Sequence, residues 1–154
     1  MINTNGKNIV FLIDCSKSMY NELETITSKI MEFQKEGKVT IHIDYYIYGE
    51  KCMKLDRLEE LQKSLYKIGS GSRTLSAIMY CIQNYKKGDR LVLITNSFPT
   101  DFISLFVVKQ LLLNLQVFLF VINLSFEVPL SLHYLADKIV SYRKTIAIDL
   151  TKIL

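Results

Sequence analysis

Three polar stretches of the sequence carry side chains whose types and spacing could do chemistry. In the first, Asp14, Ser16 and Ser18 stand at alternate positions directly after the apolar run 9–13. Alternate residues of an extended segment point to the same side, so these three oxygen-bearing side chains can face one ligand. A helix pattern follows, and its N-terminus would lie at the same place.

Two later stretches offer similar donors. Residues 69–74 read Gly-Ser-Gly-Ser-Arg-Thr, and residues 95–101 read Thr-Asn-Ser-Phe-Pro-Thr-Asp. Neither contains a histidine or a cysteine. Carboxylate, hydroxyl and amide oxygens are hard ligands, which suit Mg²⁺ or Mn²⁺ rather than zinc or copper. The three stretches together therefore predict a divalent metal site.

Each of these residues also has an ordinary structural role open to it. Ser16 or Ser18 could cap the following helix while Asp14 accepts hydrogen bonds from backbone amides. The same kind of alternative, a helix cap or a turn residue, applies to Thr74, Asn96 and Asp101. Because the stretches occur together, the metal site is the favoured interpretation of the first one.

The chain around these stretches alternates between strand and helix patterns. We expect strands at residues 9–13, 39–48, 51–55, 91–95, 117–122 and 145–148. We expect helices at residues 18–35, 58–66, 75–85, 101–114 and 130–137. This alternation predicts an α/β fold with a doubly wound, mostly parallel sheet and helices on both faces. The tight turn at 49–50 predicts one antiparallel edge strand, and ligands of such sheets bind where the strand order reverses.

Composition and charge narrow the function further. A chain of 154 residues with 49% hydrophobic residues predicts a single domain over 1–154. The net charge is +4 and the basic residues form pairs rather than runs, which argues against nucleic-acid binding. The longest purely apolar run, 117–122, is too short to span a membrane, and residues 1–8 lack a signal-peptide pattern. Three cysteines without a Cys-x-x-Cys motif indicate reduced thiols and a cytoplasmic protein.

The three stretches together resemble the von Willebrand factor A (vWA) domain, a Rossmann-like fold. The metal-ion-dependent adhesion site (MIDAS) of that family uses Asp-x-Ser-x-Ser, a threonine from a second loop and an acid from a third. The matching segments are "FLIDCSKSM", "GSGSRTL" and "LVLITNSFPTD", in the same order. The resemblance covers nearly the whole chain, including the early hairpin.

Carried over by position, the resemblance implies a metal-ligand set of Asp14, Ser16, Ser18, Thr74 and Asn96. Ser72 competes with Thr74 for the second-loop position. The family has an aspartate where this chain has Asn96, so the site keeps an oxygen but loses a negative charge. Fewer anionic ligands weaken divalent binding and leave the ion more electrophilic.

The resemblance further implies a protein-protein interaction module rather than an enzyme. A bound Mg²⁺ or Mn²⁺ would complete its coordination with an Asp or Glu of a partner protein. One alternative is a metal-free vWA-like scaffold in which Asn96 marks a degenerate site. A less favoured alternative is a phosphoryl-transfer enzyme that uses Asp14. That chemistry wants a second acid where Ser16 stands, and the sequence has no P-loop motif.

Overall fold

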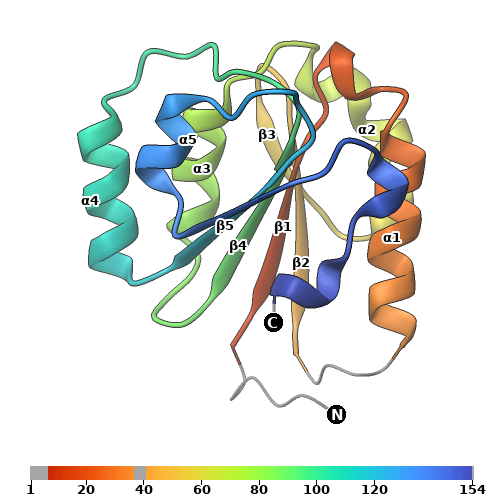
Figure 1. The fold of residues 1–154 in the computed structure, drawn as a ribbon, viewed down its shortest axis with the longest axis horizontal. Helices are drawn as coiled ribbons and strands as arrows, with labels where there is room; N and C mark the ends of the chain where they lie inside the picture. Colours follow the sequence, from red (N-terminus) through yellow and green to blue (C-terminus); the bar gives the residue numbers. More distant parts are fainter. Residues whose placement is uncertain (1–6, 37–40, 154) are drawn as a thin grey trace.

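The computed structural model describes residues 7–36 and 41–153, and its centre is a six-stranded sheet (Figure 1). The strand order is β3-β2-β1-β4-β5-β6, and every neighbouring pair is parallel except β2 with β3. The strands are β1 (Ile9–Asp14), β2 (Ile43–Tyr48), β3 (Cys52–Leu55), β4 (Arg90–Thr95), β5 (Phe118–Asn123) and β6 (Lys138–Ser141). The predicted fold class, with its antiparallel edge strand, is confirmed.

Helices cover both faces of the sheet (Figure 1). One face carries α1 (Leu23–Lys35) and α2 (Leu61–Ile68), and the other carries α3 (Thr74–Ile82), α4 (Leu105–Leu115) and α5 (Leu130–Leu135). β1 lies between the two layers, so Phe11 and Ile13 enter one core while Val10 and Leu12 enter the other. Burial on both faces explains why this strand is a continuous apolar run.

The final strand was predicted at the wrong place. Residues 145–148 do not form a strand; Thr145–Ala147 is a short 3-10 turn, η3. The last strand is β6, where Ile139 and Val140 pair with β5 at the edge of the sheet. This strand contains only two adjacent apolar residues, both half-buried, so it lacks the long apolar run that marks the central strands.

Several predicted helix boundaries were also wrong. The first helix does not begin at residue 18, because Lys17–Met19 forms a 3-10 turn, η1, and α1 begins at Leu23. The predicted helix 58–66 is a 3-10 turn, η2 (Leu58–Glu60), followed by α2. The helix predicted at 101–114 begins at Leu105, capped by the Ser104 hydroxyl.

Parts of two predictions fall on residues that the structure does not describe. Gly37, which follows the helix predicted at 18–35 and favours its end, and the first two residues of the strand predicted at 39–48 lie there. The described part of that strand begins at Ile43. Within residues 7–36 and 41–153, no helix is long and apolar enough to cross a membrane.

Candidate functional site

The candidate site lies at the carboxyl ends of β1 and β4, where the strand order reverses. From β1 the chain proceeds toward β2, whereas from β4 it proceeds toward β5 on the other side. In doubly wound sheets, ligands bind at such a position. Backbone hydrogen bonds tie the three polar stretches together there: Lys17 N donates to Ser70 O at 3.1 Å, and Thr100 N donates to Ser72 O at 2.9 Å.

Asp14 is the buried anchor of the site. Its Oδ1 accepts a hydrogen bond from the Ser16 backbone N–H at 2.8 Å. Its Oδ2 accepts one from the Thr95 hydroxyl at 2.6 Å and a long one from the Ser72 hydroxyl at 3.5 Å. The carboxylate therefore holds all three polar stretches, which are separated by up to 81 residues. Thr95 was not predicted as a site residue, because only strand pairing brings it beside Asp14.

Above Asp14, four side-chain oxygens gather toward solvent. The Ser18 hydroxyl lies 2.8 Å from Asn96 Oδ1 and 3.2 Å from the Ser16 hydroxyl. The Ser97 hydroxyl lies 2.9 Å from Ser18 Oγ, 2.9 Å from Asn96 Oδ1 and 3.2 Å from Ser16 Oγ. We call Ser16, Ser18, Asn96 and Ser97 the oxygen cluster. Ser97 was not predicted; it adds a hydroxyl that its position in the third stretch could have indicated.

Thr74 is fully buried. Its hydroxyl is 2.9 Å from the Tyr48 hydroxyl and 3.3 Å from that of Ser72. Burial, and then the nearby charge of Asp14, raise the pKa of Tyr48, so its phenol stays neutral and can donate. Of the two second-loop candidates, Ser72 is the one with a hydrogen bond to Asp14.

Asp101 and Cys15 have structural roles: Asp101 caps a helix, and Cys15 is a buried thiol. The Asp101 carboxylate accepts hydrogen bonds from the backbone N–H groups of Leu75 at 3.2 Å and Ser76 at 2.7 Å, so it caps α3. Asp101 is therefore a helix cap, but not for the helix predicted at 101–114, which begins at Leu105. Burial, and then the charge of Asp14, raise the pKa of Cys15, which disfavours its thiolate as a ligand or nucleophile.

Solved structures with a similar fold include von Willebrand factor A domains. Proximal thread matrix protein 1 from the mussel byssus, solved with a zinc-occupied MIDAS motif, is 14% identical with a TM-score of 0.67, and the match covers 99% of this chain and 45% of that one. A von Willebrand factor type A structure from Catenulispora acidiphila is 13% identical with a TM-score of 0.65, covering 90% and 39%. The ArnB paralog VWA2 from Sulfolobus acidocaldarius is 18% identical with a TM-score of 0.62, covering 91% and 42%.

This chain has the vWA fold. It spans less than half the length of the vWA chains it matches, and at 13–18% identity the likeness extends to the fold alone. No protein-family model matches the sequence, and a comparison with curated proteins finds no match. Whether this chain can hold a metal ion therefore depends on its own donor atoms.

The donor set fits a small divalent cation in type and spacing. All candidate donors are oxygens, which Mg²⁺ and Mn²⁺ prefer. Neighbouring ligands of an octahedral ion with bonds of about 2.1 Å lie about 3.0 Å apart. The contacts within the oxygen cluster, from 2.8 to 3.2 Å, match that separation.

The charge of the donor set fits less well. Asp14 is the single carboxylate hydrogen-bonded to a member of the oxygen cluster among residues 7–36 and 41–153. In the same ranges, no three His, Cys, Asp or Glu residues group closely enough to hold a metal. Asn96 also lines a pocket of about 330 Å³ whose charged residues are one acid, Glu22, and two exposed cations, Arg143 and Lys144. A cation at the oxygen cluster would thus be held mainly by neutral oxygens, and weakly.

Proposed function

We propose that this vWA domain is a protein-protein interaction module that holds Mg²⁺ or Mn²⁺ at the oxygen cluster. The observation that carries the proposal is the convergence of neutral oxygens from two loops above the buried Asp14 carboxylate. Ser16, Ser18 and Asn96 would hold the ion, with Asp14 and Thr74 acting directly or through water. When bound, the ion supplies an electrophilic position that accepts an Asp or Glu side chain of a partner protein.

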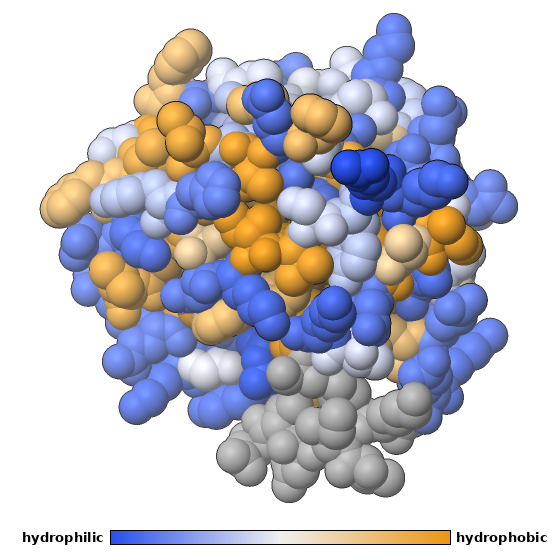
Figure 2. Space-filling model, viewed as in Figure 1, coloured by the Kyte–Doolittle hydropathy of each residue, from blue (hydrophilic) through white to orange (hydrophobic). Residues whose placement is uncertain are grey.

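The surface beside the cluster supports a docking role. Phe98 and Phe102 belong to the same loop as Asn96 and are 56% and 103% exposed. Figure 2 shows apolar side chains gathered over α4, α5 and the loops that precede them. Exposed apolar residues concentrated around a polar site are typical of protein interaction surfaces.

A second candidate is a metal-free module, and one observation favours it. The hydroxyls of Ser16, Ser18 and Ser97 and the Asn96 amide already satisfy one another, and Asn96 Nδ2 donates to Ser18 O at 3.1 Å. A cluster satisfied in this way keeps its shape without an ion. Arg143 and Lys144, which line the adjoining pocket, could then receive the partner's carboxylate.

An enzymatic role for Asp14 is not part of the proposal. Its side chain is fully buried and both of its oxygens accept hydrogen bonds, so neither oxygen is presented to a phosphoester. A cytoplasmic location is part of it, supported by cysteines that are free in this fold.

Isothermal titration with MgCl₂ and MnCl₂ tests the metal-dependent version. The wild type should bind a divalent ion, and Ser18→Ala, which removes an exposed donor of the cluster, should abolish the signal. Ser28→Ala, an exposed serine of α1, is the matched control and should bind like the wild type. Absence of divalent binding by the folded wild type at millimolar concentration would refute this version. Partner binding that survives EDTA would then establish the metal-free one.

A further inference from the structure

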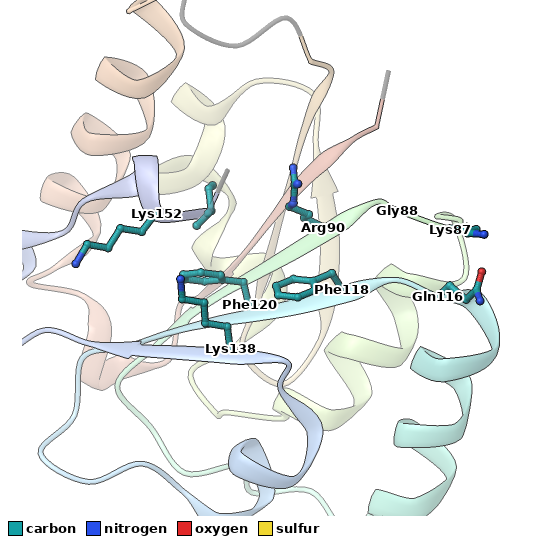
Figure 3. A pocket seen from close by; sticks show the side chains of 9 residues that line it. Lys87, Gly88, Arg90, Gln116, Phe118, Phe120, Lys138 and Lys152 are labelled. Atoms are coloured by element: carbon teal, nitrogen blue, oxygen red, sulfur yellow. The ribbon is translucent and has the colours of Figure 1, made fainter. Parts of the chain in front are cut away.

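A second pocket lies at the opposite end of the strands from the oxygen cluster. It has a volume of about 610 Å³ and is formed at the amino ends of β4, β5 and β6, beneath the 3-10 turn η4 (Leu150–Ile153). Its lining residues are Lys87, Gly88, Arg90, Gln116, Phe118, Phe120, Lys138, Lys152 and Ile153 (Figure 3). The volume is in the range of small-molecule sites.

The charged residues that line this pocket are all cations. Lys87, Arg90, Lys138 and Lys152 line it, and no acidic residue does. In the part of the chain that the structure describes, none of them forms an ion pair with a carboxylate. The charged side chains of the lining are therefore all positive, and this favours anions over cations as ligands.

The two acidic residues next to the pocket in sequence are already engaged. Asp89 Oδ1 accepts a hydrogen bond from the Asn8 backbone N–H at 2.8 Å. Asp137 Oδ2 accepts one from the Leu119 backbone N–H at 2.8 Å. Both carboxylates therefore have backbone partners, and neither forms an ion pair with Arg90 or Lys138 among the described residues.

Arg90 gives separate evidence that the pocket binds a hydrogen-bond acceptor. Its Nη1 is buried, and it makes no hydrogen bond with any of the described residues. A buried guanidinium nitrogen without an acceptor is costly, and native structures supply acceptors for such groups. Guanidinium groups pair preferentially with planar or tetrahedral oxyanions, since two N–H groups can donate at once.

Two phenyl rings form the apolar part of the pocket. In Figure 3, Phe118 and Phe120 lie side by side, and Lys138 reaches over Phe120. The Arg90 side chain extends on the other side of the rings, and Lys87 and Lys152 point away from them. The Lys138 ammonium lies 5.6 Å from the centre of the Phe120 ring, a cation–π contact that orients it. Phe120 is only 2% exposed, but Phe118 is 37% exposed and offers its ring to a ligand.

We infer that this pocket binds a small organic phosphate. The phosphate group would lie between Arg90 and Lys138, and the planar or apolar part of the molecule would pack on Phe118. A nucleoside monophosphate has both parts and a suitable size. The inference is independent of the oxygen cluster, which lies at the other end of the strands.

Calorimetric titration at low salt tests the inference with three probes: AMP, adenosine and inorganic phosphate. AMP should bind the wild type most tightly, and its affinity should fall with added salt because the contact is charged. Arg90→Gln and Lys138→Gln should each weaken AMP binding at least tenfold. Lys63→Gln, an exposed lysine of α2 outside the pocket, is the matched control and should leave the affinity unchanged.

Four results would overturn the inference. Failure of AMP to bind the wild type contradicts the site itself, and unchanged AMP affinity in both pocket variants contradicts its location. Adenosine binding as tightly as AMP contradicts the role of the phosphate, and inorganic phosphate binding as tightly as AMP contradicts that of Phe118. Circular dichroism checks that each variant is folded. Lys138 is exposed, so Lys138→Gln keeps the test valid if Arg90→Gln does not fold.

Discussion

Replacing Asn96 by aspartate gives the sharpest test of the proposal that the oxygen cluster holds a metal ion. Asn96 Oδ1 lies 2.8 Å from the Ser18 hydroxyl and 2.9 Å from the Ser97 hydroxyl, at the solvent side of the oxygen cluster. An ion held by these oxygens would therefore lie within about 4 Å of a carboxylate at position 96. The substitution adds one negative charge next to the ion and leaves the other donors in place.

The expected gain in affinity follows from Coulomb's law. Two unit charges about 4 Å apart attract by about 1 kcal/mol in water, so a divalent ion gains about 2 kcal/mol. The water-like value is appropriate because Ser18 is exposed and Asn96 is half-buried. About 2 kcal/mol corresponds to roughly 30-fold tighter binding. Without metal, the variant loses the Asn96 Nδ2 hydrogen bond to Ser18 O, so its free energy of unfolding should fall by about 1 kcal/mol.

Two measurements on the Asn96→Asp variant test the expected gain in metal affinity and the expected loss of stability without metal. Calorimetry should give a lower Kd for Mg²⁺ with Asn96→Asp than with the wild type. Thermal unfolding should give a lower Tm in EDTA and a larger increase in Tm with Mg²⁺. Asn114→Asp, the same change at an exposed position of α4, controls for overall charge. If Asn96→Asp tightens binding no more than Asn114→Asp does, position 96 does not adjoin the ion and the reasoning fails.

Three further predictions concern buried polar groups and thiols. Thr95→Val removes the 2.6 Å hydrogen bond to Asp14 and should lower the free energy of unfolding by about 1.5–3 kcal/mol in urea denaturation; a change near zero would contradict the anchoring role of Asp14. Tyr85→Phe removes a 2.6 Å hydrogen bond to Asp44 and should be destabilising at pH 7. Burial raises the pKa of Asp44, but the hydrogen bonds from Tyr85 and His42 outweigh it and lower that pKa overall. This stabilisation is present above the unfolded-state pKa of about 3.9 and is lost as pH falls through the lower folded value, so wild type and Tyr85→Phe should converge in acid and stay apart at neutral pH. Iodoacetamide should modify half-buried Cys52 first, as peptide mass spectrometry can show, because burial raises the pKa of the other two cysteines, Cys15 and Cys81.

Local pattern was enough to predict the class of the fold. Three local patterns carried this prediction: the apolar run that becomes β1, the helix periodicity after it and the hairpin around residues 49–50. Each depends on residues close together in the sequence and not on the rest of the chain. Patterns at the edge of the sheet were less informative. β6 has only Ile139 and Val140 as apolar residues, so its place became clear only from its pairing with β5.

The sequence by itself determined that oxygen-bearing side chains follow β1 and β4 and precede α3, because these polar residues interrupt apolar elements. Only the tertiary structure decided which of them meet. Parallel pairing of β1 with β4 brings Thr95 and Ser97 to Asp14 and Ser16 from 81 residues away. Asp101 instead turns to α3, whose first turn lacks an acceptor from its own N-cap residue. The physical reason is that a hydrogen bond depends on distance in space, and strand pairing, not sequence order, sets that distance.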